Sequence, residues 1–88
     1  MGEINYESLV AKLIEPLVTH PEDVKVVVEQ LGDSEYHIKA FVNPSDLGRV
    51  IGKKGRVASA IRTIANAAAV RQSDSIEIEF DSLENLNN

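Results

Sequence analysis

The chain has 88 residues, enough for one hydrophobic core and too few for two, so we expect a single domain. It contains no cysteine, which excludes a disulfide framework and a thiolate metal site. No N-terminal stretch resembles a signal peptide and no apolar run approaches membrane length, so the sequence predicts a soluble, cytoplasmic protein without membrane contact.

The net charge of −5 would argue against a nucleic-acid partner if the charges were evenly spread, but they are not. Residues 44–71 hold six basic side chains and one acidic one, a local charge of +5. The rest of the chain holds three lysines and thirteen acidic side chains, a charge of −10. Because a ligand meets the local surface rather than the average, the sequence permits an anionic partner at this segment.

The N-terminal segment is predicted to form a helix that proline ends. Residues 3–18 carry apolar side chains three and four residues apart, which is the spacing of one helical face. Pro16 should end or kink this helix near Glu15, because it lacks an N–H group and crowds the carbonyl of Lys12. The following residues, 19–23, are typical of a turn.

Three segments alternate apolar and polar side chains with the period of a β-strand, namely residues 24–29, 35–42 and 76–81. Gly32-Asp33-Ser34 supplies a hairpin turn between the first two. Each strand has one apolar face and a more polar opposite face. This pattern predicts a three-stranded sheet with helices packed on one side.

Two helices are expected between the second and third strands. Asn43-Pro44 has the pattern of an N-cap followed by proline at the first helical position, and a short helix should run to about Val50. After a turn at 52–55, a longer helix is expected from about Arg56 to Val70. Its apolar face is predicted from Val57, Ile61, Ile64 and Ala68.

The predicted order is therefore α-β-β-α-α-β, an α+β fold. The connection through the two helices favours parallel pairing of the second and third strands, so the sheet should be mixed. We expect residues 1–81 to form the domain and residues 82–88 to form a polar C-terminal tail.

The most informative motif is Val50-Ile51-Gly52-Lys53-Lys54-Gly55-Arg56, which lies at the start of the longer helix. A glycine turn between helices is often only structural. Here, however, two lysines stand between the glycines, and bare backbone meets the free N–H groups of a helix start. Those features suit an anionic backbone such as a phosphodiester.

Two other phosphate-binding motifs are excluded. A P-loop needs four residues between its glycines, whereas Gly48 and Gly52 enclose three, and Lys54 stands where a hydroxyl should meet magnesium. A dinucleotide-binding fingerprint belongs at a strand-to-helix turn, and this turn is predicted to join two helices. We therefore discard nucleotide hydrolysis and hydride transfer.

The motif resembles the KH domain in its type II arrangement, which implies an α+β, type II KH fold. The residues that match the family core are Val50, Ile51, Gly52, Gly55 and Ile61. Together with His20–Val24, Asp46–Arg56 and Ala60–Ile64, they make the chain similar to small bacterial RNA-binding proteins with a single KH domain. The resemblance covers roughly residues 4–81, and Lys54 departs from the Gln or Gly that is usual there.

The resemblance implies a non-enzymatic protein that clamps about four nucleotides of single-stranded RNA beside an apolar groove. Glycines allow close approach of a sugar-phosphate backbone, and the cations attract it. The small side chains of Ala58 and Ser59 are expected at the groove, and without a nearby aromatic residue base stacking should contribute little. The residues assigned to the RNA-binding site are Leu47, Gly48, Arg49, Ile51, Gly52, Lys53, Lys54, Gly55, Arg56 and Ser59.

Such proteins are associated with RNA chaperoning, with post-transcriptional control, and with cell elongation and division. The resemblance also implies a homodimer, or a heterodimer with a larger Jag-type partner that carries its own KH domain. The main alternative to RNA binding is a protein-interaction subunit whose chief role is dimerisation with that partner. DNA recognition through Arg56, Ser59 and Arg62 is a less favoured hypothesis, because it leaves the glycine turn unexplained.

No cofactor, metal or small-molecule substrate is expected. His20 and His37 are interpreted as isolated residues without acidic neighbours at ligand spacing, and Ser45 and Ser59 have no histidine partner for nucleophilic catalysis. No acid–base pair accompanies the basic turn, so an enzyme is the least favoured class.

Overall fold

The computed structural model describes residues 4–86, so the predicted start of the domain at residues 1–3 and the end of the predicted tail at residues 87–88 lie outside the described residues. Helix α1 spans Tyr6–Ile14, and the Asn5 side chain caps it by accepting a hydrogen bond from the Ser8 N–H at 3.0 Å. A short 3₁₀ turn, Glu15–Leu17, follows at the proline. The predicted helix end at Glu15 is confirmed, since Pro16 cannot continue the α-helical hydrogen bonding.

The sheet consists of β1 (Lys25–Gln30), β2 (Glu35–Val42) and β3 (Ser75–Ser82), in the spatial order β1-β2-β3. Strands β1 and β2 are antiparallel, with Val28 opposite Ile38. Strands β2 and β3 are parallel, with Ile38 opposite Ile78. The predicted mixed sheet is confirmed, and β3 lies at one of its edges.

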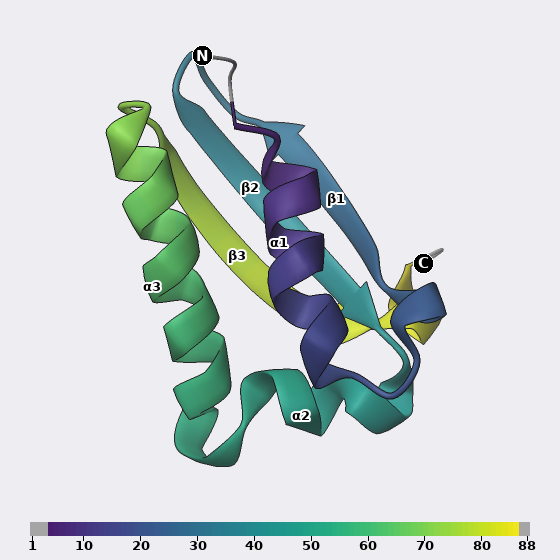
Figure 1. Cartoon of the computed structure of the whole chain (residues 1–88). Helices are drawn as coiled ribbons and strands as arrows, with labels where there is room; N and C mark the ends of the chain where they lie inside the picture. The colour runs from purple at the N-terminus through teal and green to yellow at the C-terminus, as the bar shows by residue number, and fades with distance from the viewer. Residues whose placement is uncertain (1–3, 87–88) are drawn as a thin grey trace.

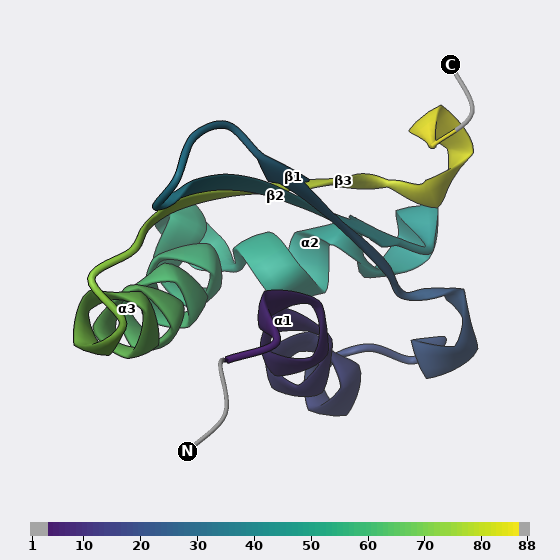
Figure 2. The same cartoon turned by 90° about the horizontal axis from the view of Figure 1, so that it is seen from above.

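Helix α2 spans Leu47–Ile51 and helix α3 spans Arg56–Arg71. A 3₁₀ turn, Pro44–Asp46, leads into α2, and the Asn43 side chain caps that turn by accepting from the Ser45 N–H at 2.9 Å. Figure 1 shows α1 and α3 lying along the sheet, with α2 crossing beside them at one end. Figure 2 shows all three helices on the same face of the sheet, which confirms the predicted α+β layers.

The core lies between this sheet face and the helices. Its fully buried side chains include Val10 and Ile14 of α1, Ile38 and Val42 of β2, and Val50 of α2. No helix in residues 4–86 is both long enough and apolar enough to cross a membrane. A last 3₁₀ turn, Leu83–Asn85, follows β3, and the division into a domain and a tail at residue 82 stays a prediction.

The face by which α3 packs agrees only in part with the one predicted. The buried residues of α3 are Ala58, Ile61, Ala65 and Ala69. Ile64 is 52% exposed, so its assignment to the buried face was wrong. Ile61 is buried and Val57 is half-buried, as predicted, while the small residues Ala65 and Ala69 take the core positions expected for Ile64 and Ala68.

Candidate nucleic-acid interface

Two glycines with positive φ angles shape the turn between α2 and α3. Gly52 has φ 76° and ψ 173°, and Gly55 has φ 73° and ψ 16°. Lys54 between them is also left-handed, with φ 58°. A Cβ atom on Gly52 would lie 2.4 Å from the Val57 Cγ2, whereas one on Gly55 would meet nothing within 4 Å. Gly52 is therefore required by both conformation and space, and Gly55 by conformation alone.

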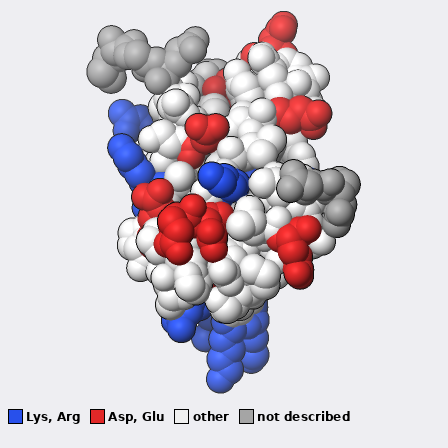
Figure 3. All heavy atoms as spheres, turned by 90° about the vertical axis from the view of Figure 1, so that its right-hand side faces the viewer, with Lys and Arg blue, Asp and Glu red and all other residues white. Residues whose placement is uncertain are grey.

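Three cationic side chains surround this turn. Lys53, Lys54 and Arg56 are exposed, and none of them takes part in an ion pair among residues 4–86. Figure 3 shows lysine and arginine side chains projecting together at the bottom of the view, the end at which α2 meets α3 in Figure 1, while acidic side chains lie on the face above. The turn is thus a local basic surface on an acidic protein.

The first turn of α3 adds backbone donors to this surface. Gly55 is the N-cap of α3, and no side chain caps the helix there. The first N–H groups of an α-helix have no partners within the helix, and they carry a partial positive charge. Bare backbone and unpaired cations therefore meet at residues 52–56, beside the positive end of α3, whereas the N–H groups of Gly55 and Arg56 already donate to the Gly52 and Lys53 carbonyl oxygens.

The remaining predicted site residues lie on the two helices beside the turn. Leu47, Gly48 and Ile51 belong to α2; Leu47 is half-buried, and Ile51 is 37% exposed. Ser59 is exposed on α3. Ala58, which the sequence also placed at a groove, is buried with 3% exposure, so that assignment was wrong. Its side chain belongs to the core face of α3.

Arg49 belongs to α2 as well, and it is only partly free. Its Nε lies 3.4 Å from the Asp46 Oδ1, while its side chain stays 59% exposed. The guanidinium can therefore still reach a phosphate beside the turn, although the buried carboxylate of Asp46 attracts it.

Asp46 is a buried carboxylate that fastens the α1–β1 connection to the start of α2. It accepts hydrogen bonds from the Thr19 N–H at 3.0 Å, the Thr19 hydroxyl at 2.9 Å and the His20 N–H at 3.0 Å. Burial opposes its charge, but these hydrogen bonds outweigh burial and lower the pKa of Asp46 below its ordinary value. The sequence shows no sign of this role, because the partners lie 26 and 27 residues away.

His20 is not isolated, contrary to the sequence-based interpretation. The 3₁₀ turn Pro21–Asp23 places possible ligand atoms of His20, Glu22 and Asp23 within 4.8 Å of one another. The His20 Nδ1 lies 3.3 Å from the Glu22 Oε2, and the Asp23 Oδ2 accepts from the Asn43 Nδ2 at 3.0 Å. His37 likewise contacts Glu79 across the parallel strands.

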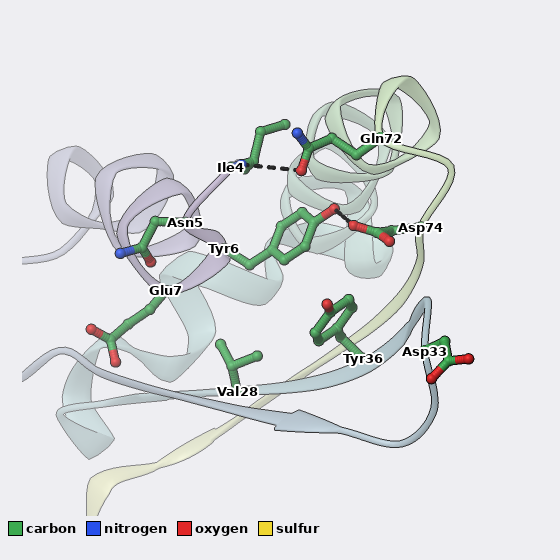
Figure 4. Close-up of a pocket in the computed structure, with 9 residues that line it drawn as sticks. All are labelled: Ile4, Asn5, Tyr6, Glu7, Val28, Asp33, Tyr36, Gln72 and Asp74. Atoms are coloured by element: carbon green, nitrogen blue, oxygen red, sulfur yellow. Dashed lines mark hydrogen bonds between the residues drawn. The ribbon is translucent and has the colours of Figure 1, made fainter. Parts of the chain in front are cut away.

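A cleft of about 460 Å³ opens between the start of α1 and the β1–β2 hairpin. Figure 4 shows the Tyr6 side chain reaching from α1 toward Asp74, and Tyr36 rising from β2 below it. The Tyr6 hydroxyl donates to the Asp74 Oδ2 at 2.6 Å, and the two tyrosine rings lie 5.4 Å apart. Burial, aided by this bond to a carboxylate, raises the pKa of Tyr6. With Glu7 and Asp33 also at its rim, the cleft is acidic and unsuited to an anionic ligand.

A family model described as the KH domain of KhpA/KhpB matches residues 7–80. The chain belongs to this family. Because the family is non-enzymatic, the prediction that the chain is not an enzyme is confirmed.

Curated relatives agree with this assignment. The chain is 40% identical over 80 residues to "RNA-binding protein KhpA" of Bacillus subtilis (strain 168), a match that covers 91% of this chain and 98% of that protein. It is 42% identical over 74 residues to the protein of the same name from Listeria monocytogenes, covering 84% of this chain and 96% of the other. The predicted resemblance to small single-KH proteins is thus confirmed.

A solved structure shows the same fold. The chain superimposes with a TM-score of 0.61 and 19% identity on Era, crystallised "in complex with MgGDPNP and nucleotides 1506-1542 of 16S ribosomal RNA". The match covers 88% of this chain and 29% of the Era chain. At that identity it supports the fold alone, and the fold is the predicted α-β-β-α-α-β arrangement.

Proposed function

We propose that the protein binds single-stranded RNA by clamping the phosphate backbone at the Gly52–Arg56 turn. The observation that carries this proposal is the coincidence, in five residues, of two glycines, three unpaired cations and the uncapped start of α3. Family relatives named as RNA-binding proteins support it. The exposed lysines attract the strand, and the glycines let it approach the main chain closely at the positive end of α3.

The apolar side of α2 completes the site. Leu47 and Ile51 offer partly exposed apolar surface beside the turn, against which bases pack when the backbone is clamped. Gly48 is exposed, and a Cβ atom there would meet nothing within 4 Å, so it leaves room for a strand. Arg49 and Ser59 flank the turn as donors for phosphate or sugar. We propose that this binding serves an RNA chaperone or a post-transcriptional regulator linked to cell elongation and division.

The test is a fluorescence-anisotropy titration of an unstructured single-stranded RNA with the wild type and the Lys53→Asp, Lys54→Asp variant. With two or three phosphates neutralised, wild-type affinity should fall about 7- to 18-fold between 50 and 200 mM salt. The variant should bind RNA at least tenfold more weakly, because two carboxylates that repel phosphate replace two lysines that attract it. Duplex DNA should bind more weakly than the RNA.

The matched control is Lys25→Asp, Lys39→Asp, which makes the same charge change on exposed strand residues. It should bind RNA within about twofold of the wild type, with circular dichroism showing that both variants fold. Equal losses of RNA affinity in the two variants would show that the effect depends only on the net charge of the protein. An absence of binding by the folded wild type would contradict the proposal.

A second candidate function is assembly, as a homodimer or with a larger Jag-type partner carrying its own KH domain. Ile64 and Val70 of α3 favour it, because they are 52% and 72% exposed and apolar. If the Lys53→Asp, Lys54→Asp variant lost self-association in sedimentation along with RNA binding, the turn itself would be an interface. If association stays intact, the two functions use different surfaces.

A further inference from the structure

Arg62 is a cation held in one position beside the edge of the sheet. Its Nε donates to the Ile78 carbonyl oxygen at 3.1 Å, and its guanidinium carbon lies 5.2 Å from the centre of the Phe80 ring. Within residues 4–86 no carboxylate forms an ion pair with it, although acidic residues outnumber basic ones in the chain. Because the guanidinium of Arg62 is held in place and has no ion-pair partner among these residues, it can still bind a ligand.

The position of Arg62 continues the proposed RNA site along α3. Gly55, Ser59 and Arg62 are spaced four and three residues apart, so they share one helical face. At 1.5 Å per residue, that face carries the site about 10 Å from the glycine turn. Arg62 contacts β3, which forms a free edge of the sheet, so this face of the helix lies beside that edge. A strand clamped at the turn and running along α3 reaches Arg62 next.

The two contacts decide which atoms of Arg62 remain for a ligand. The Nε is used by the Ile78 carbonyl and the guanidinium lies over the Phe80 ring, which leaves the two terminal NH₂ groups as a planar fork. Such a fork fits two acceptor atoms that lie side by side. Guanine presents O6 and N7 in this way, and cytosine presents O2 and N3. In adenine and uracil, acceptors alternate with N–H donors, so the fork meets one acceptor and one repelling donor.

We propose that Arg62 reads one base of the bound RNA and favours guanine or cytosine over adenine or uracil. This inference rests on the RNA-binding function proposed above and adds base selection to it. Phe80 acts as the positioning residue, because its ring holds the guanidinium in place. The expectation that no aromatic residue lies near the site is then incomplete, since Phe80 contributes through Arg62.

The competing explanation is that Arg62 only fastens α3 to the edge strand. Arg62→Lys separates the two, because lysine keeps the charge and loses the planar fork. Arg71→Lys is the matched control, as Arg71 is the exposed arginine at the far end of the same helix. Melting temperatures of both variants report any purely structural effect.

The experiment measures the affinities of labelled C8, U8 and A8 RNA for the wild type and both variants. A bidentate contact should make wild-type binding to C8 about tenfold tighter than to U8 or A8. Arg62→Lys should reduce that ratio to about two or less, mainly by weakening the binding of C8, and Arg71→Lys should keep it. Equal wild-type affinities for the three RNAs, or a ratio that survives Arg62→Lys, would overturn the proposal. If no RNA binds the wild type, the proposed function itself fails.

Discussion

The two ends of this small domain are built in opposite ways. The end at the α2–α3 turn is made from a continuous run of sequence, is basic, and depends on two glycines with positive φ angles. The end at the Tyr6 cleft is acidic and is assembled from segments far apart, since the bond between Tyr6 and Asp74 joins residues 68 positions apart. A binding motif can be local, whereas a cleft is a product of the whole fold.

The contrast also orients a ligand. Lys53, Lys54 and Arg56 gather at the turn, whereas Glu7, Asp33 and Asp74 line the cleft at the other end, so an anionic strand is attracted at one end and repelled at the other. Such a distribution steers association without raising net charge, and salt weakens it. The variants below change the glycine turn at the basic end, then the buried carboxylate of Asp46, and last the Tyr6 hydroxyl at the acidic end.

The largest effect should come from Gly52→Ala. Alanine at φ 76°, ψ 173° is strained, and its Cβ would lie 2.4 Å from Val57, so we expect a loss of about 3–5 kcal/mol in the free energy of unfolding. Gly55→Ala is the matched variant, with a similar φ and open space, and should cost only about 1–2 kcal/mol. Urea denaturation measures both; equal losses would show that the contact with Val57 does not matter.

Asp46→Asn should have an intermediate effect on stability. Asparagine supplies one acceptor instead of two and turns an NH₂ group toward one of the donors on Thr19 and His20. Because the pKa of Asp46 is lowered in the folded state, its charge stabilises the fold fully above the ordinary value of 3.8. The stabilisation is lost as the pH falls through the lowered pKa.

Thermal unfolding from pH 2 to pH 7 tests this prediction. The wild type should melt several degrees above Asp46→Asn at pH 6, and the two curves should converge toward pH 2. A gap in melting temperature that did not change with pH would mean that the charge of Asp46 contributes nothing.

Tyr6→Phe should have the smallest effect and should separate the two ends. It removes the 2.6 Å hydrogen bond to Asp74 and keeps the ring, so stability should fall by about 1 kcal/mol. RNA affinity should stay within twofold of the wild type, because the cleft lies away from the basic turn. A larger loss of affinity in the anisotropy assay would connect the two ends and contradict their independence.

The elements and the basic turn could be predicted because their signals are local. Pro16 ends α1, the alternating valines mark β1, and the two glycines of the turn enclose two lysines within four consecutive residues. Each of these features depends on neighbours within a few residues, which a single sequence displays.

The errors arise where partners are distant. Ile64 and Ala65 are both apolar and adjacent, and only the close approach of α3 to the sheet determines that Ala65 is buried. His20 meets Glu22 through a 3₁₀ turn, and its N–H is held by Asp46 of a different segment. Arg62 contacts Ile78 and Phe80 of β3, which lie 16 and 18 residues later in the sequence.

The central claim, that RNA meets the basic end and not the acidic cleft, can be tested most directly by two-dimensional ¹H–¹⁵N NMR of the wild type during titration with a single-stranded RNA. The account predicts that amide signals of residues 47–62 shift progressively, and that those of Tyr6, Tyr36 and Asp74 stay in place. Shifts concentrated at the cleft, with the signals of the turn unchanged, would contradict it.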